Sequence, residues 1–273
     1  MGESRVALVT GCSSGIGQDL AGRLVQRGYE VVATARRVED LSGLQAGTKL
    51  SLDVTDDASV GAAVEAALAA HGRIDVLVNN AGFSLPGAIE DRPEAIRAMF
   101  ETNLFGALRL IRAVSPTMRR QGQGRIVNIG SISGRWSLAL WGGYSATKAA
   151  LASITYAARG ELGPFGIKVV LVEPGPIRTG FHPKTELAFE GLAENMSSPY
   201  ADLYRRGRAL NAALHGKDPG PEAVSRVVLR AIEARRPALH YFAGLSPGIR
   251  LVLAAPVGLR EAFFEAALAR VKG

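Results

Sequence analysis

A tyrosine and a lysine lie four residues apart in the segment YSATKAA, which runs from Tyr144 through Lys148 to Ala150. If the segment is helical, the two side chains share one face, with Cβ atoms about 5 to 6 Å apart. A free phenol has a pKa of about 10 and is a poor base at neutral pH. A cation at about 4 Å, in an effective dielectric of about 20, lowers that pKa by roughly three units. The pair therefore predicts a proton-transfer catalyst, although the same spacing also occurs on ordinary amphipathic helices.

The fold that must hold this pair in place is indicated by an alternation of short and long apolar segments along the chain. Short β-branched runs alternate with longer Ala- and Leu-rich periodic runs, which predicts repeated βαβ units. We expect one domain over residues 1–273, with an α/β fold of the Rossmann type: a doubly wound parallel sheet with helices on both faces. The expected strands are RVALVT, EVVATA, KLSLDV, IDVLVNN, GRIVNIG, IKVVLVEP and ALHYF, and the expected helices begin near Gly15 and Asp57, run from Leu104 to Arg120, surround Tyr144, cover 223–234 and end the chain.

The periodic pattern weakens between Pro174 and Pro221, after the sixth expected strand, where prolines and aromatic residues are frequent. Ligands bind outside the carboxyl ends of the strands in open α/β sheets, so a long insertion there is typical of a ligand lid. We therefore expect residues 180–216 to form a substrate lid. Residues 245–273 are expected to form a carboxyl-terminal extension with an amphipathic helix.

The composition excludes several classes of protein. The chain has 273 residues and a formal net charge of +7, but its basic residues are spread out, apart from RRGR at 205–208, so we expect no nucleic-acid partner. The histidines and the single cysteine, Cys12, lack the spacing of metal ligands. The apolar segment LVLAAPVGL at 251–259 is too short to span a bilayer. We expect no metal, no membrane span, and a cytoplasmic location without disulfides or a leader sequence.

The glycine-rich segment TGCSSGIG, at 10–17, directly follows the first expected strand. Glycines permit a tight turn and close approach of a pyrophosphate, and the next helix offers unpaired N–H groups at its amino terminus. The segment predicts dinucleotide binding. An acidic residue about 20 positions later selects NAD, whereas an arginine there accommodates the 2′-phosphate of NADP. Because Arg36 and Arg37 occupy this region and Asp40 lies later, we predict NADP(H). The alternative is that both arginines are simply solvent-exposed side chains of a loop.

Five motifs, in matching order and spacing, resemble the short-chain dehydrogenase/reductase family. They are the glycine turn, NNAG at 79–82, Ser131 thirteen residues before the tyrosine, the Tyr144 and Lys148 pair, and PGPIRT at 174–179. The resemblance runs from Val6 to about Thr179. Beyond that point the chain is similar in outline to the hydroxysteroid and retinol dehydrogenase-like branch.

This resemblance implies a role for each matched residue. Tyr144 is expected to exchange a proton with the substrate oxygen, Ser131 to hydrogen-bond that oxygen, and Lys148 to lower the tyrosine pKa and bind the nicotinamide ribose. Asn103 is expected to distort a helix and support a water-linked proton path. The implied cofactor-binding residues are Gly11, Ser13, Ser14, Gly15, Ile16, Gly17, Arg36, Arg37, Asp53, Val54, Asn80, Ala81, Gly82, Tyr144, Lys148, Pro174, Gly175, Ile177 and Thr179.

Large apolar residues are expected to face the substrate, although aromatic residues in loops also serve as anchors. They favour a bulky hydrophobic ketone or secondary alcohol, and thus an NADPH-dependent carbonyl reductase or alcohol dehydrogenase. The alternatives are a β-ketoacyl thioester reductase and a non-catalytic NADP(H)-sensing regulator. Ala-rich helices at 104–120 and 146–158 also predict a homodimer or homotetramer, as in the family. The expected substrate-facing residues are Phe83, Leu85, Trp136, Trp141 and Phe181.

Overall fold

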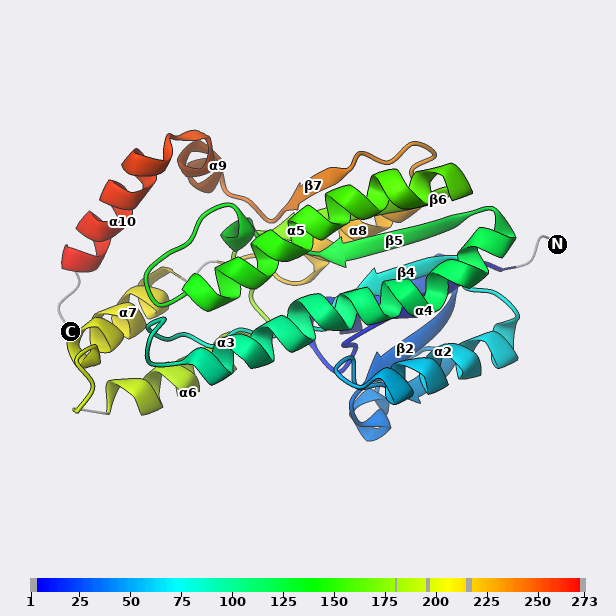
Figure 1. The fold of residues 1–273 in the computed structure, drawn as a ribbon, viewed down its shortest axis with the longest axis horizontal. Helices are drawn as coiled ribbons and strands as arrows, with labels where there is room; N and C mark the ends of the chain where they lie inside the picture. Colours follow the sequence, from blue (N-terminus) through cyan, green and yellow to red (C-terminus); the bar gives the residue numbers. More distant parts are fainter. Residues whose placement is uncertain (1–3, 180, 195–196, 215–217, 271–273) are drawn as a thin grey trace.

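One parallel sheet organises the protein. The computed structural model describes residues 4–179, 181–194, 197–214 and 218–270, and within them seven strands pair in the order β3-β2-β1-β4-β5-β6-β7 (Figure 1). The order reverses between β1 and β4, so ligands are expected at the carboxyl ends of these two strands. The predicted doubly wound sheet is confirmed. The strands, all parallel to their neighbours, are β1 (Val6–Val9), β2 (Glu30–Ala35), β3 (Thr48–Ser51), β4 (Val76–Asn79), β5 (Gly124–Ile129), β6 (Ile167–Pro174) and β7 (His240–Ala243).

Helices cover both faces of the sheet, which explains why its strands are apolar throughout. Helices α1 (Gly15–Gln26) and α8 (Glu222–Glu233) pack together on one face, while α2 (Asp57–His71), α4 (Gly106–Gln121) and α5 (Gly142–Leu162) cover the other (Figure 1). A hydrophobic core lies on each face of the sheet, and successive side chains of β1 point alternately into the two cores. Ala7 and Val9 are buried on the α1 side, and Val6 and Leu8 on the α2 side.

Local signals set the ends of α2. The carboxylate of Asp56 accepts hydrogen bonds from the main-chain N–H groups of Ala58 and Ser59, which is a standard cap for the first turn. The helix ends at Gly72, whose φ of 71° is left-handed and favours glycine. The start predicted near Asp57 is therefore confirmed.

The segments expected to form a lid and a carboxyl-terminal extension are both helical. The expected lid at 180–216 contains α6 (Phe181–Ala193) and α7 (Ala201–Leu214), although 180, 195–196 and 215–216 lie outside the described residues. The extension contains α9 (Pro247–Ala254) and α10 (Val257–Arg270), where one helix was expected. Helix α3 (Pro93–Phe100), which was not expected from the sequence, precedes a π-helical turn at Glu101–Phe105. Among the described residues, no helix combines the length and the apolar character needed to cross a membrane.

Candidate active site

Tyr144 and Lys148 lie in the first turns of α5, and the helix brings them together as their spacing predicted. The Nζ atom of Lys148 lies 5.8 Å from the centre of the tyrosine ring, and the lysine is buried. Small residues permit this arrangement, because the preceding loop packs directly against α5. A Cβ atom at Gly134 would lie 2.9 Å from the carbonyl carbon of Lys148.

Ser131 meets Tyr144 across a tight turn. The serine follows β5, and its Oγ accepts a hydrogen bond from the main-chain N–H of Ser133, 3.1 Å away, at the start of a short 3₁₀ turn. The side chains of Ser131 and Tyr144 are hydrogen-bonded to each other. Two hydroxyl groups therefore converge beside one ammonium group, and together they can hold a carbonyl or alcohol oxygen.

Burial dominates the proton equilibria of this cluster. It raises the pKa of Tyr144 to about 12, although the hydrogen bond with Ser131 acts in the opposite direction. Burial also lowers the pKa of Lys148 to about 8. Loss of water around the phenolate is thus the larger of the two effects on the tyrosine pKa, and the expected lowering by the lysine stays a prediction. A phenol that stays protonated at neutral pH is suited to donating its proton to a carbonyl oxygen.

Asn103 lies in the π-helical turn between α3 and α4, where the helix distortion expected at this residue is observed. Its Nδ2 donates to the main-chain oxygen of Phe83 at 2.9 Å and to Oγ1 of Thr147 at 3.1 Å, while its Oδ1 accepts from the N–H of Phe83 at 3.0 Å. The residue thus joins α4 to α5 and to the segment after β4.

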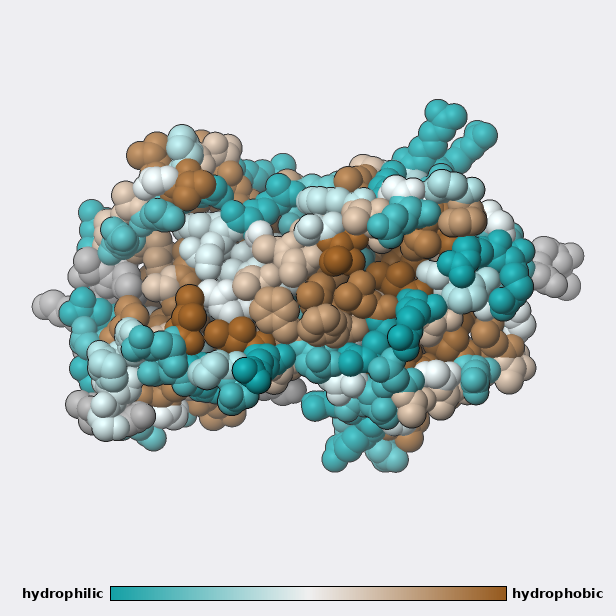
Figure 2. All heavy atoms as spheres, viewed as in Figure 1, coloured by the Kyte–Doolittle hydropathy of each residue, from teal (hydrophilic) through white to brown (hydrophobic). Residues whose placement is uncertain are grey.

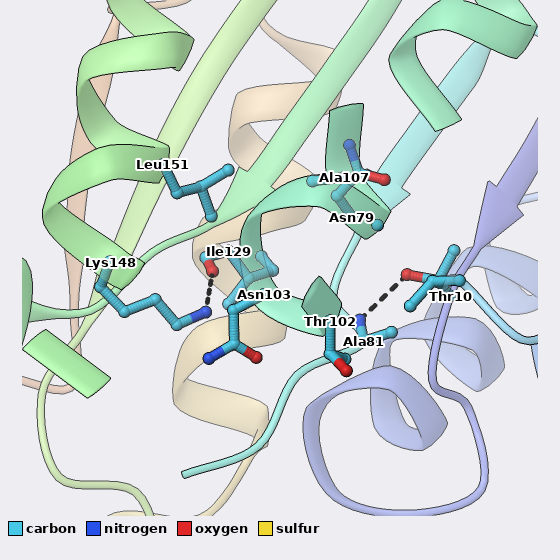
Figure 3. Close-up of a pocket in the computed structure, with 11 residues that line it drawn as sticks. Thr10, Asn79, Ala81, Thr102, Asn103, Ala107, Ile129, Lys148 and Leu151 are labelled. Atoms are coloured by element: carbon cyan, nitrogen blue, oxygen red, sulfur yellow. Dashed lines mark hydrogen bonds between the residues drawn. The ribbon is translucent and has the colours of Figure 1, made fainter. Parts of the chain in front are cut away.

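A small cavity lies beside Asn103 and Lys148 (Figure 3). Its volume of about 10 Å³ is close to the smallest that holds one water molecule. Lys148 donates from Nζ to the main-chain oxygen of Ile129 at 2.9 Å along one wall, and Thr10 lies on another. The cavity therefore connects the catalytic cluster with the glycine turn. The part of Asn103 in a proton path stays a prediction.

The glycine turn between β1 and α1 has the geometry that a pyrophosphate site requires. Gly11 and Gly15 have φ values of 72° and 59°, in the left-handed region that favours glycine. A Cβ atom at Gly17 would lie 2.3 Å from the main-chain oxygen of Gly11. The neighbouring Ser13 and Ser14 are exposed, Ile16 is half-buried, and Ser14 precedes α1 in an extended conformation. The residues present therefore fit a dinucleotide at the amino terminus of α1.

The segment NNAG braces this turn from β4. The side-chain Nδ2 of Asn80 donates to the main-chain oxygens of Thr10 and Gly11 at 2.9 and 3.1 Å. The N–H groups of Asn80 and Ala81 donate to Oγ1 of Thr10. A Cβ atom at Gly82 would lie 2.9 Å from Oδ1 of Asn103. The segment therefore links the turn to Asn103.

Arg36 and Arg37 follow β2 but differ in their partners. Nη2 of Arg37 lies 2.6 Å from Oδ1 of Asp40 in an ion pair on the protein surface. Arg36 is also exposed, and within the described part of the chain its guanidinium forms no ion pair. Its positive charge lies close enough to Asp53 to help lower the pKa of that carboxyl, after the larger effect of hydrogen bonds from Thr55. Of the two arginines, Arg37 is therefore held by a neighbouring carboxylate, and Arg36 extends without an ion pair among the described residues.

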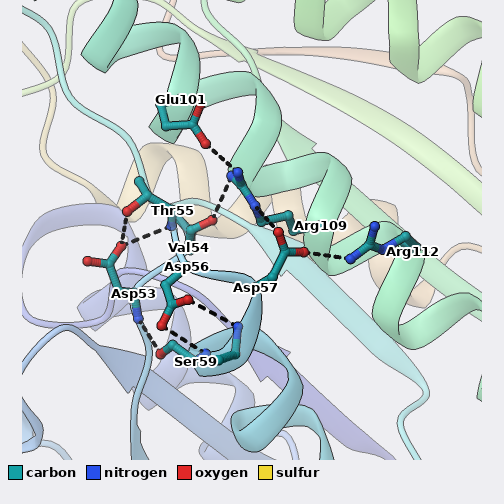
Figure 4. Close-up of polar contacts among 10 residues, drawn as sticks. Asp53, Val54, Thr55, Asp56, Asp57, Ser59, Glu101, Arg109 and Arg112 are labelled. Atoms are coloured by element: carbon teal, nitrogen blue, oxygen red, sulfur yellow. Dashed lines mark hydrogen bonds and ion pairs between the residues drawn. The ribbon is translucent and has the colours of Figure 1, made fainter.

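A polar network holds the segment around Asp53 and Val54 (Figure 4). Asp53 accepts from the N–H and the hydroxyl of Thr55 at 2.9 and 2.7 Å. Arg109 of α4 donates to the main-chain oxygen of Val54 and pairs with Asp57 at 3.3 Å and with Glu101. The loop after β3, where the adenine is expected, is thus fixed to α4.

The last motif, at 174–179, closes over the glycine turn from the other side. Gly175 follows Pro174 at the end of β6, and its N–H donates to the main-chain oxygen of Ala243 at 2.9 Å. Ile177 is buried. A Cβ atom at Gly15 would lie 3.1 Å from that of Thr179. All the sequence motifs expected at the cofactor therefore meet at the carboxyl ends of the strands.

Of the residues expected to face the substrate, Trp141 lies beside Tyr144. Trp141 makes edge contacts with Tyr144 and with Phe189 of α6, at centroid distances of 6.4 and 6.1 Å. Trp136 makes a similar contact with Phe264 of α10 at 6.2 Å. Phe83 and Leu85 are half-buried after β4. Phe181 begins α6, but its side chain lies outside the described residues.

Several residues at the lid were not singled out from sequence. Tyr204 of α7 is fully buried; its hydroxyl donates to Oδ2 of Asp91 at 2.8 Å and accepts from the N–H of Ala88 at 3.0 Å. Leu140 packs with it and has a φ of 70°, which is strained for a leucine. The aromatic residues of the lid gave a signal in the sequence, but the conformation of Leu140 gave none.

Comparisons with known proteins agree with this geometry. The family model for short chain dehydrogenases matches residues 5–188. Retinol dehydrogenase 8 of Bos taurus is 36% identical over 254 residues, covering 86% of this chain and 80% of the relative. Human 17-beta-hydroxysteroid dehydrogenase type 1 is 34% identical, covering 87% and 76%. A crystal structure of a short-chain dehydrogenase from Streptomyces avermitilis has a TM-score of 0.77 at 34% identity and covers 98% of this chain and 95% of that one. The chain therefore belongs to the short-chain dehydrogenases, in the hydroxysteroid and retinol dehydrogenase branch, and is an oxidoreductase that acts on alcohol and ketone groups with a nicotinamide cofactor.

Proposed function

We propose that the protein is an NADP(H)-dependent oxidoreductase that interconverts a bulky hydrophobic ketone and its secondary alcohol. The observation that carries this proposal is the meeting of Ser131, Tyr144 and Lys148 beside the glycine turn. A sensor that only bound the cofactor would have no use for all three.

Each residue of the cluster has a distinct task in this proposal. A bound nicotinamide supplies or accepts the hydride. Ser131 and Tyr144 hydrogen-bond the substrate oxygen, and the protonated phenol gives up its proton as negative charge develops there. Lys148 brings a positive charge near the tyrosine ring, which favours the phenolate that remains. In the reverse direction the phenolate accepts the proton of the alcohol.

The preference for NADP(H) is supported by the difference between the two arginines after β2. Arg37 is already paired with Asp40, whereas Arg36 has no ion pair within the described residues. An arginine at this place accommodates the 2′-phosphate of NADP. We therefore assign phosphate recognition to Arg36.

The substrate class is supported by the apolar surroundings of the tyrosine. Trp141 contacts the tyrosine and packs in turn with Leu140 and Phe189, and Trp136 lies in the same loop before α5. Large apolar side chains with few polar groups favour a bulky apolar ligand. The relatives named retinol dehydrogenase 8 and 17-beta-hydroxysteroid dehydrogenase type 1 are named for substrates of this kind.

The test is NADPH consumption by the purified protein with ketones graded from small aliphatic compounds through acyl thioesters to steroids. Turnover of bulky apolar ketones is expected. Turnover confined to acyl thioesters would replace this proposal with a β-ketoacyl reductase. NADPH binding without turnover of any ketone would favour the cofactor-sensing regulator.

We also propose a homodimer or homotetramer that forms through the outer faces of α4 and α5. Figure 2 shows an apolar area on the face of the molecule where these helices lie. Phe105 is 46% exposed there, and the partly buried Leu108 and Ile154 belong to the neighbouring apolar cluster. We further propose a cytoplasmic location, supported by the single free thiol, Cys12.

A further inference from the structure

The buried charged side chains in the described part of the chain are those of Asp75, Lys148 and Glu173. Asp75 has a structural role, since it accepts from the main-chain N–H of Val6 at 2.8 Å and pairs with Arg73 at 2.7 Å. Lys148 belongs to the candidate active site. Glu173, near the end of β6, is 1% exposed and takes no part in either set of contacts. A buried carboxylate costs free energy unless it is paired, so its place calls for a reason.

Glu173 contacts both ends of the tight turn that begins at Ser131. At the far end, Nε of Arg135 donates to Oε2 of Glu173 at 2.5 Å. At the near end, a Cβ atom at Gly130 would lie 3.2 Å from Cγ of Glu173, so the main chain before the serine packs directly against the glutamate. Nε2 of His240 on β7 contacts the same carboxylate oxygen. The carboxylate therefore joins the turn to two strands of the sheet.

The turn itself transmits this restraint to the serine hydroxyl. It is closed by main-chain hydrogen bonds from the N–H of Gly134 to the oxygen of Ser131 at 3.0 Å and from that of Arg135 to the oxygen of Ile132 at 2.9 Å. The N–H of Ser133 donates to Oγ of Ser131 at 3.1 Å. Because these bonds leave the turn little freedom, holding its two ends fixes the direction in which the serine hydroxyl points.

We propose that Glu173 is a positioning residue, which holds the turn at 131–135 through its ion pair with Arg135 so that Ser131 meets the substrate oxygen. The inference rests on the proposed function, because it assumes that the serine hydrogen-bonds that oxygen. Stability alone is a poor reason for the ion pair, since well-packed apolar side chains of similar size often stabilise a protein as well or better. A charge-assisted hydrogen bond to a planar guanidinium also fixes geometry, which a turn beside the reacting groups requires.

The chain contains a direct reporter of this loop. Its two tryptophans, Trp136 and Trp141, both lie between Ser131 and the start of α5, so intrinsic tryptophan fluorescence reports this loop alone. Acrylamide quenching and the emission wavelength measure how far water reaches the two indole rings. Neither readout depends on a ketone being reduced.

The test compares wild type with Glu173→Met, which keeps the length of the side chain but removes its charge and its acceptor oxygens. The matched control is Glu233→Met. Glu233 also pairs with an arginine, Arg27, at 2.9 Å, but on α8 at the protein surface, where an ion pair contributes little. Circular dichroism and the Kd for NADPH check that each variant is folded.

Glu173→Met should increase acrylamide quenching and shift the emission to longer wavelength, because the released loop exposes its tryptophans to water. The kcat for ketone reduction should fall by about 10- to 100-fold, because a misplaced hydroxyl no longer meets the substrate oxygen, while the Kd for NADPH stays almost unchanged. In a Ser131→Ala background the same substitution should change kcat by less than about twofold, because no serine hydroxyl remains to be positioned. Glu233→Met should match wild type in every readout.

Two further variants keep the test decisive. Glu173→Gln retains an oxygen that can accept from Arg135, so it should lose less kcat than Glu173→Met; equal losses would contradict a role for this bond. If Glu173→Met does not fold, Arg135→Met removes the same bond from a side chain that is 38% exposed, and the same changes in fluorescence and kcat are expected.

Unchanged fluorescence in the folded Glu173→Met variant would overturn the proposal. So would a loss of kcat that is equally large in the Ser131→Ala background, since Glu173 would then act on another group. Weaker NADPH binding at unchanged kcat would assign Glu173 to the neighbouring cofactor segment at 174–179 instead. If the wild type reduces no ketone, the proposed function fails, whereas the fluorescence still shows whether Glu173 holds the turn.

Discussion

The ammonium group of Lys148 donates a hydrogen bond to the main-chain oxygen of Ile129, 2.9 Å away. Ile129 is the last residue of β5 and lies two positions before Ser131. This buried contact fixes α5, which carries Tyr144, to the strand end that carries the serine. The lysine therefore positions both hydroxyl groups as well as supplying charge.

Replacing Tyr144 with phenylalanine should lower kcat/KM for ketone reduction by about 10²- to 10⁴-fold, because the substrate oxygen loses its proton donor. NADPH fluorescence titration should give an almost unchanged Kd. The matched control is Tyr156→Phe, since this second tyrosine of α5 is 42% exposed and its hydroxyl accepts a hydrogen bond from Arg135, whereas that of Tyr144 is bonded to Ser131. Equal activity of the two variants would remove Tyr144 from the chemistry.

Ketone reduction should lose activity above about pH 8, because burial lowers the pKa of Lys148 to about 8, whereas burial raises that of Tyr144 to about 12. The phenol keeps its proton in this range while the ammonium loses its own. In the unfolded chain the lysine has its ordinary pKa of 10.5. Between about pH 8 and pH 10 the unfolded chain therefore binds more protons than the folded protein does, so the contribution of this lysine to the free energy of unfolding increases with pH.

Activity and stability should thus diverge with pH, which separates a catalytic effect from unfolding. The measurements are kcat/KM and the free energy of unfolding across pH 7 to 10, roughly the window between the two pKa values of the lysine. Lys148→Arg, which stays charged, should remove the decline in its residual activity. A decline that persists in this variant would assign the titration to another group.

Replacing Arg36 with aspartate should lower kcat/KM with NADPH by roughly 10- to 100-fold, the effect of losing one charge-assisted hydrogen bond. The value with NADH should change much less. Arg37→Asp is the control, since Arg37 is occupied by Asp40. Equal losses with both cofactors would show that the phosphate is recognised elsewhere.

Gly17→Ala should abolish tight NADPH binding and lower Tm, because the new Cβ would lie 2.3 Å from the main-chain oxygen of Gly11. Gly22→Ala lies on the same helix, and no atom outside it is within 4 Å of the new Cβ. That control should stabilise the protein by up to about 1 kcal/mol through helix propensity. Thermal unfolding with and without NADPH measures both effects, and a Gly17→Ala variant that binds normally would refute the close approach.

Phe105→Glu should shift the protein from an oligomer to a monomer, because it places a charge in the apolar area over α4 and α5. Phe165→Glu is a control of similar exposure, 49% against 46%, in the turn after α5. Sedimentation velocity at micromolar concentration measures the mass. A monomeric wild type would contradict the proposed assembly.

Much of the fold follows from local signals in the sequence. The strand EVVATA has the predicted bounds of β2, and the glycine turn, its conformations and its close contacts are where the motif placed them. These features depend on residues near each other along the chain. The order of the motifs also predicted which strand ends would meet, since parallel strands present their carboxyl ends at one edge.

The rest depends on contacts between distant residues. Pro199 lies between α6 and α7, and α7 is held by burial of Tyr204 against Leu140 and Ala88, which sequence spacing does not reveal. The burial of Tyr144, which raises the pKa of the phenol, is a second example. Its distance from the lysine was foreseeable, but its burial, which dominates, is a property of the folded whole.

The single thiol of the chain has a practical consequence. Cys12 is buried behind the glycine turn, and burial raises its pKa to about 12, so it stays a protonated thiol that alkylating reagents do not reach. The native protein is therefore expected not to react with thiol-specific labels, so that only an introduced cysteine would be labelled. A cysteine introduced at an exposed position such as Leu251 would carry a solvatochromic dye alone, and its emission colour would report the polarity around that residue directly.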